Sequence, residues 1–170
     1  DDFGMAGTNA VTLEASGIPN LNLSNAVAYL LGYPHGCIEQ TVSKAFPQLF
    51  LSSLYQLNVK QQKEAKENVI YALSKLQNHQ LPNGGVSLWA SASQPHEWAS
   101  TYATHFMIEA KDNGFAVPSG MLEGALKYLK NSVNTWQPTT SSNAHYSSNQ
   151  QAYRLYVLAL SGDANLGAMN

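Results

Sequence analysis

The sequence predicts an all-α fold in which helices form an outer and an inner layer. Apolar residues recur at intervals of three and four along several separate segments, which is the period of an amphipathic helix. Most of these segments carry one apolar stripe, whereas one near the C-terminus is apolar on almost all sides. A helix of the second kind is normally buried by its neighbours, so the two kinds together indicate two layers.

The composition narrows the class of protein. At 170 residues, the chain is long enough for one domain with a substantial core. The hydrophobic content of 44% argues against a disordered chain, and no apolar run approaches the length that crosses a bilayer. The net charge of −2, without a basic cluster, argues against nucleic acid as a partner. With only 12% charged residues and no signal segment, we expect a domain excised from a larger assembly.

The N-terminal region is predicted to lead into a short helix. Residues 10–14 alternate between apolar and polar side chains, which is typical of a short strand or of a linker. A helix is then expected over residues 24–31, with Ser24 as its N-cap. Gly32 is expected to end this helix, because glycine readily takes the left-handed conformation that closes a helix.

The clearest amphipathic pattern runs over residues 37–57. Pro47 lies inside it and is expected to kink or split the helix, because proline lacks an amide donor and clashes with the preceding turn. The apolar positions of this segment are Val42, Ala45, Phe46, Leu49, Phe50, Leu54 and Leu57.

A second long helix is predicted over residues 61–77, with lysines and glutamates interleaved on its solvent side. The connection that follows, residues 79–97, contains two prolines and a glycine pair, which indicates non-helical structure. A third long helix is expected over residues 98–111.

The C-terminal third is predicted to hold two more helices. Pro118 suits the first turn of the first of them. Residues 132–147 are polar and are predicted to form a loop. The last helix, residues 150–160, is the segment that is apolar almost all round, so we expect its neighbours to bury it on most sides.

Cys37 is the only cysteine of the chain, and Gln40 follows it one helical turn later. Residues three apart share a helix face, with Cβ atoms about 5–6 Å apart. A thiol and a carboxamide held at that spacing can condense with loss of ammonia and leave an internal γ-glutamyl thioester. Such a bond is a stored electrophile that acylates a nearby amine or hydroxyl. On this interpretation, Cys37 supplies the sulphur and Gln40 supplies the acyl carbon.

Two neighbouring residues belong to the same motif, and other interpretations of it stay open. Gly36 allows a tight entry into the helix. Glu39 either receives protons or is simply favoured near a helix N-terminus. Alternatively, Cys37 is a small buried hydrophobe in a helical scaffold and Gln40 a surface residue. A cysteine hydrolase that uses Cys37 with His35 or another histidine is the remaining alternative.

Residues 36–40 resemble the thioester signature, Gly-Cys-x-Glu-Gln, of the alpha-2-macroglobulin and complement family. The longer stretch of residues 33–41 is similar to the bacterial branch of that family. Residues 83–89, 98–106 and 152–160 resemble later segments of the bacterial thioester domains.

The resemblance implies an α/α toroid of helical hairpins, of which this chain would form an incomplete arc with exposed apolar helix faces. Residues 21–170 would be the N-terminal part of that thioester domain, and residues 1–20 a linker or strand from a preceding domain. The family also implies a protease trap of the bacterial periplasm or cell envelope, which acylates attacking proteases once and is not an enzyme. Its partners would be those proteases and neighbouring domains of the same chain, and no cofactor is expected.

The histidines raise two further questions. In some family members a histidine from a later segment attacks the thioester first and redirects transfer to hydroxyls, and His145 is the candidate for that role here. A metal site is not expected, because His96 lacks a second histidine four residues later and His105 falls on the opposite side of any helix. We also expect Cys37 to be unlinked in the isolated chain, because part of the shield against water belongs to another domain.

Overall fold

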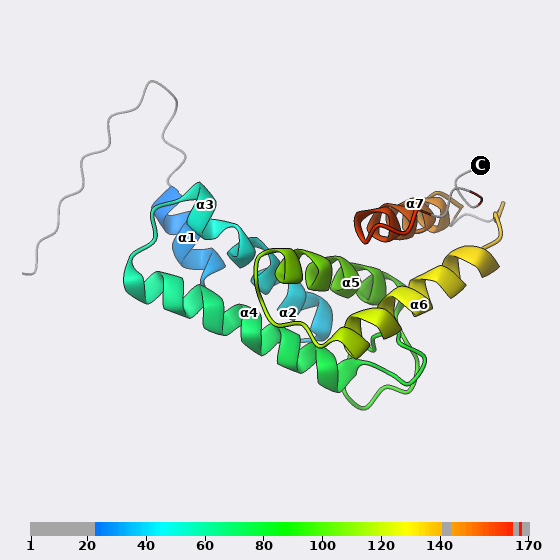
Figure 1. Cartoon of the computed structure of the whole chain (residues 1–170), viewed down its shortest axis with the longest axis horizontal. Helices are drawn as coiled ribbons and strands as arrows, with labels where there is room; N and C mark the ends of the chain where they lie inside the picture. Colours follow the sequence, from blue (N-terminus) through cyan, green and yellow to red (C-terminus); the bar gives the residue numbers. More distant parts are fainter. Residues whose placement is uncertain (1–22, 141–143, 165–166, 168–170) are drawn as a thin grey trace, which may run out of the picture.

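The computed structural model describes residues 23–140, 144–164 and 167, which form a helical assembly (Figure 1). No strand occurs among these residues, and their one β-type backbone pairing is an isolated antiparallel bridge between Gln80 and Val86. The all-α prediction is therefore confirmed. In chain order, the elements are α1 (Leu23–Leu30), α2 (Ile38–Ala45), the 3-10 helix η1 (Phe46–Leu49), α3 (Leu51–Leu54), α4 (Val59–His79), α5 (Glu97–Asp112), α6 (Ser119–Thr135) and α7 (Ala144–Leu160).

Helix α5 is the central helix of the assembly. It packs against α2, α4, α6 and α7, and Figure 1 shows it between α4 and α7. Its buried residues include small hydroxyl side chains as well as apolar ones, which is why its central place is not obvious from hydropathy. They are Ala99, Ser100, Thr101, Ala103, Thr104, Phe106, Met107, Ile108 and Ala110.

One hydrophobic core joins α2, α4, α5, α6 and α7. Its largest fully buried side chains are Phe106, Ile38, Leu76, Met107 and Leu129. Ile38 is the residue next to Cys37, so the start of α2 is fixed in the core at the position directly after the thiol. A smaller hydrophobic cluster is formed by residues of α1, α3, α4 and the segments next to them. It consists of Val27, Leu31, Leu51, Leu57 and Ala65.

The predicted break at Pro47 is confirmed. Pro47 lies in the first turn of η1, and the long amphipathic segment is divided into α2, η1 and α3. Gln48 becomes buried at this break, where its amide donates to the Leu30 carbonyl (2.9 Å). Leu54, expected on the buried face, is exposed, whereas Leu51 of the same short helix is buried.

The prediction that the last helix is buried on most sides is wrong. Helix α7 buries one face, with Val157 and Leu158 in the core, whereas Tyr156 and Leu160 are exposed. Arg154 is buried on the packed face because Glu97 of α5 pairs with it at 2.7 Å. An ion pair therefore occupies part of the face that hydropathy assigned to apolar residues. Closure of the helices into a toroid stays a prediction.

The polar loop predicted over residues 132–147 is too long. Helix α6 continues to Thr135, since its apolar stripe extends to the buried Val133. Helix α7 already begins at Ala144. Polar residues of this region have partners within it, since Trp136 Nε1 donates to Ser147 Oγ (2.9 Å). Polarity alone therefore misidentified helical residues as a loop.

Two predicted helix starts are displaced by one position. Helix α1 begins at Leu23, so Ser24 lies inside its first turn and is not the N-cap. Helix α6 begins at Ser119, and Pro118 occupies the N-cap position, where its carbonyl accepts from the Met121 and Leu122 amides.

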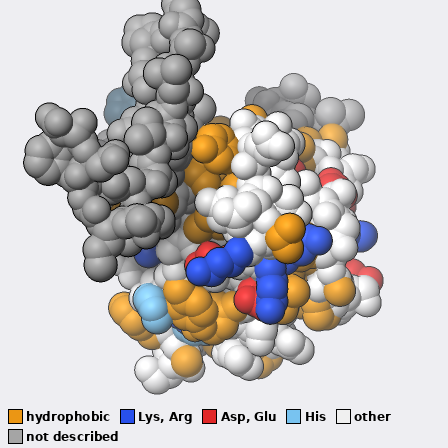
Figure 2. Space-filling view, turned by 90° about the vertical axis from the view of Figure 1, so that its left-hand side faces the viewer, with side chains coloured by type: hydrophobic (Ala, Val, Ile, Leu, Met, Phe, Trp, Pro, Cys, Tyr) orange, Lys and Arg blue, Asp and Glu red, His pale blue; other side chains and the backbone are white. Residues whose placement is uncertain are grey.

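On the face shown in Figure 2, lysines lie beside acidic side chains among apolar and neutral polar ones.

Candidate functional site

Cys37 lies at the N-cap position of α2, with extended backbone angles of φ −65° and ψ 172°. Its side chain is partly exposed. The next residue, Ile38, is buried and its amide donates to the Leu88 carbonyl at 3.1 Å. The thiol therefore stands at the surface on a backbone that both the core and the connection after α4 hold in place.

The side chain of Gln40 folds back over Cys37. The two residues form a capping box, in which the Cys37 amide donates to Gln40 Oε1 (3.2 Å). A capping box normally pairs a serine or threonine with a glutamate or glutamine. Here the same local geometry brings a thiol residue and a carboxamide together in the first turn of α2.

Gly36 makes this arrangement possible in two ways. Its φ of +104° lies in the region that side chains with a Cβ rarely adopt. A Cβ at this position would also overlap Gln40 Oε1 and lie only 2.9 Å from Gln40 Cδ. The missing side chain is thus the space into which the Gln40 carboxamide fits.

Lys75 of α4 holds the same turn from the other side. Its Nζ donates to the Gly36 carbonyl (2.6 Å) and to Thr41 Oγ1 (3.0 Å). Thr41 Oγ1 in turn donates to the Cys37 carbonyl (2.9 Å). The Tyr71 ring lies one turn earlier on α4, with its centroid 6.0 Å from Lys75 Nζ. These contacts fix two successive peptide groups next to the thiol.

The loop that enters the motif is packed on α4 as well. The Tyr33 ring lies 4.6 Å from the Tyr71 ring and 4.5 Å from the His35 ring, measured between centroids. Lys44, in the last turn of α2, donates to the Tyr33 carbonyl at 3.5 Å. Sequence reasoning missed Lys75 and Tyr71, since no local pattern marks residues that act on a distant loop, and it gave Thr41 no role although Thr41 ends the motif stretch.

Glu39 is partly buried in the first turn of α2. With His35, Gln40, Ser43 and other residues, it lines a hollow of about 670 Å³. Burial raises the pKa of Tyr102 on α5, and the nearby Glu39 carboxylate raises it further, while a hydrogen bond with Ser43 opposes the shift. The Tyr102 phenol therefore stays protonated beside the Glu39 carboxylate.

The structure does not bring His145 to the motif. His145 is exposed in the first turn of α7, which packs against α5 and α6, whereas the motif begins α2. In Figure 1 the N-terminal end of α7, drawn in orange, is the end that lies away from α2. His35 is close in sequence, but its ring packs on Tyr33, and the described residues include no histidine hydrogen-bonded to Cys37.

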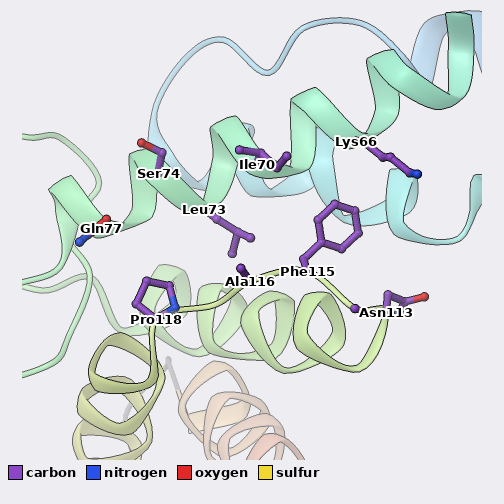
Figure 3. A pocket seen from close by; sticks show the side chains of 10 residues that line it. Lys66, Ile70, Leu73, Ser74, Gln77, Asn113, Phe115, Ala116 and Pro118 are labelled. Atoms are coloured by element: carbon purple, nitrogen blue, oxygen red, sulfur yellow. The ribbon is translucent and has the colours of Figure 1, made fainter.

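A second hollow, of about 620 Å³, lies between α4 and the segment that joins α5 to α6 (Figure 3). In that view Ile70 and Leu73 of α4 face Phe115 and Ala116 of the connecting segment. The lining is mainly apolar and contains none of the motif residues. This hollow is therefore separate from the first turn of α2.

The sequence matches the family model of the A-macroglobulin TED domain over residues 11–153. The chain belongs to this family. It is 32% identical over 178 residues to the alpha-2-macroglobulin of Escherichia coli (strain K12), an alignment that covers 98% of this chain and 11% of that protein. The resemblance to bacterial alpha-2-macroglobulins is thereby confirmed, and the chain spans about a tenth of the length of such relatives.

Solved structures of the family share this fold. Salmonella alpha-2-macroglobulin reacted with methylamine superposes with a TM-score of 0.74 at 31% identity, covering 91% of this chain and 10% of that one. Trypsin-activated alpha-2-macroglobulin from Escherichia coli gives 0.68 at 26% identity, covering 81% and 10%. The boundary at residue 20 and the roles of the individual motif residues stay predictions.

Proposed function

We propose that this chain is the thioester-bearing part of a bacterial alpha-2-macroglobulin-like protease trap, and that Cys37 and Gln40 form its thioester. The observation that carries the proposal is the Gln40 carboxamide folded over Cys37, in a space that exists because residue 36 is glycine.

The chemistry follows from the two side chains. Attack of Cys37 Sγ on Gln40 Cδ forms the C–S bond and breaks the bond from Cδ to Nε2, and the nitrogen leaves as ammonia with the thiol proton. In the opening reaction an amine of the target attacks Cδ and the bond to sulphur breaks. Sulphur keeps the electron pair and takes up the proton that the amine loses. The target remains joined to Gln40 by an amide bond, so each molecule reacts once and acts as an inhibitor rather than an enzyme.

The proposed targets are proteases that attack the full-length protein, and the proposed acceptor group is a lysine amine. Relatives support both parts, since one was solved after reaction with methylamine and another after activation by trypsin. Because His145 lies away from the motif, direct transfer to amines is the simpler route. Neighbouring domains of the same chain would exclude water from the bond until activation.

The proposed location is the bacterial periplasm or cell envelope, by analogy with the family. No helix among the described residues is long and apolar enough to cross a membrane. Fractionation of cells that produce the full-length protein tests the location, and recovery of the protein only with cytoplasmic markers would contradict it.

The thioester itself is tested by intact mass on the full-length protein. We expect a mass one ammonia below the sequence value, and we expect methylamine to add its own mass while it releases one titratable thiol. Cys37→Ala should show the full sequence mass, no released thiol and no covalent product with trypsin. A wild-type protein of full mass that never captures a protease covalently would refute the proposal. Catalytic turnover of a small ester, lost in Cys37→Ala, would instead favour a cysteine hydrolase.

A further inference from the structure

The peptide group between Gly36 and Cys37 makes two hydrogen bonds that point in opposite directions. Its carbonyl oxygen accepts from Lys75 Nζ at 2.6 Å. Its N–H donates to Gln40 Oε1 at 3.2 Å. The same peptide therefore links the ammonium of α4 to the carbonyl oxygen of the reacting carboxamide.

The Lys75 bond is short and involves a charged donor, which makes it one of the stronger kinds of hydrogen bond in proteins. An ammonium on a peptide oxygen withdraws electron density from the peptide and makes its N–H a better donor, since hydrogen bonds in a chain polarise one another. Gln40 Oε1 is the oxygen that becomes negative when Cδ turns tetrahedral. Donors placed at such an oxygen lower the barrier of acyl transfer.

We propose that the Cys37 backbone N–H is the oxyanion donor for Gln40 Oε1, and that Lys75 is a positioning residue that orients and strengthens this donor. The inference rests on the proposed thioester function. It applies to both reactions of the bond, because formation and opening pass through a tetrahedral Gln40 Cδ with the same oxygen. When the tetrahedral state collapses, the negative charge returns from Oε1 to the C=O bond as ammonia leaves during formation, or as the Cys37 thiolate leaves during opening.

The surroundings of Lys75 suit a fixed role. It lies next to the fully buried Leu76 on α4, and its Nζ has a second partner in Thr41 Oγ1 at 3.0 Å. The Tyr71 ring lies near its ammonium. By contrast, Lys63 on the same helix is exposed and makes only a long pair with Glu67, at 3.7 Å. Lys63 therefore provides a matched control for the loss of a lysine from α4.

The experiment uses the full-length protein and measures the rate at which methylamine releases the Cys37 thiol, together with intact mass before reaction and thermal unfolding. The variants are Lys75→Met, which keeps the apolar stem, Lys75→Gln, which keeps a neutral donor, and Lys75→Arg, which keeps the charge. We expect Met and Gln to slow thiol release roughly tenfold, less than the loss of a whole oxyanion donor. Lys75→Arg should recover most of the rate, and Lys63→Met should match the wild type.

The outcomes separate the two proposals. A wild-type protein without the ammonia deficit and without a releasable thiol overturns the proposed function, and this inference with it. A normal deficit and an unchanged rate in both Lys75→Met and Lys75→Gln overturn the inference alone. Faster thiol release with a lower unfolding temperature also overturns it, since Lys75 would then only hold the loop. Two neutral variants are included, so that the test can still be carried out if only one of them folds.

Discussion

The turn formed by residues 36–40, called the reactive turn here because the proposed thioester pair lies in it, and the aromatic interface between α5 and α7 differ in side-chain chemistry and in the sequence range of their contacts. The reactive turn is polar and partly exposed, and the contact from Cys37 to Gln40 spans three positions. The aromatic interface joins Trp98 and His105 to Tyr153, with centroid separations of 5.3 and 5.8 Å, and His105 Nδ1 lies 2.9 Å from the Tyr153 hydroxyl across 48 positions of sequence.

The difference leads us to expect that the proposed chemistry and the stability of this chain depend on different residues. A turn of five residues can arrange a thiol and a carboxamide while burying only Ile38 deeply. The α5 interface makes no contact with the reacting atoms, but it joins helices that are far apart in sequence. Substitutions in the two regions should therefore affect different measurements.

The largest expected effect is the loss of the thioester in Gly36→Ala. The new Cβ would overlap Gln40 Oε1, so the carboxamide must leave its place over Cys37. Intact mass should show no ammonia deficit, and methylamine should release no thiol. Strain at positive φ should cost about 1–2 kcal/mol of stability in addition.

Gly114→Ala is the matched control for that substitution. Gly114 has a similar φ of +83°, but outside the adjacent backbone no atom lies within 4 Å of the position that its Cβ would take. It should lose a comparable amount of stability and keep the whole ammonia deficit. Equal loss of the thioester in both variants would mean that backbone strain, and not the space beside Gln40, controls the chemistry.

The next largest effect is expected for Phe106→Ala on α5, which should change stability alone. Phe106 is fully buried and packs edge-on against Phe46 at 5.7 Å. Removal of a buried phenyl ring typically costs about 3–5 kcal/mol, because it leaves a cavity. Denaturant unfolding measures the loss. The rate of thiol release in the protein that remains folded should stay unchanged, and a large change in that rate would show that the reactive turn is coupled to the core around α5.

The smallest effect is a pH dependence of stability that arises from His105. Burial lowers the pKa of His105, although Glu109 at 3.6 Å opposes the shift. The unfolded chain, in which histidine has a pKa of about 6.5, therefore binds this proton more readily than the folded chain. The contribution of His105 to stability should be fully present above about pH 6.5 and should fall as the pH decreases through that value.

Denaturant midpoints at pH 7.5 and 5.5, compared between the wild type and His105→Gln, test this expectation. The variant keeps a polar side chain next to Tyr153 but has no titrating group there. Its midpoint should fall less between the two pH values than that of the wild type. An equal or larger fall would exclude His105 as a source of the acid sensitivity.

Regular helices were predictable where one local period dominates. The segments at α4 and α5 were identified almost to their ends, because apolar spacing and the flanking Pro and Gly residues are local signals. The burial of α7 was not predictable, since Arg154 is buried only because Glu97 lies opposite it, 57 positions away. The same limit applies to residues 132–147, where Trp136 donates to Ser147 and much of the apparently polar loop belongs to α6 and α7.

The sequence by itself determined the reactive turn. Gly36, Cys37 and Gln40 lie within five positions, and their geometry follows from helix spacing and from the missing Cβ of glycine, which are local properties of the chain. Only the tertiary structure decided what holds that turn and which helix is central. Lys75 reaches Gly36 across 39 positions, and such a contact forms only when the core packs α4 against α2.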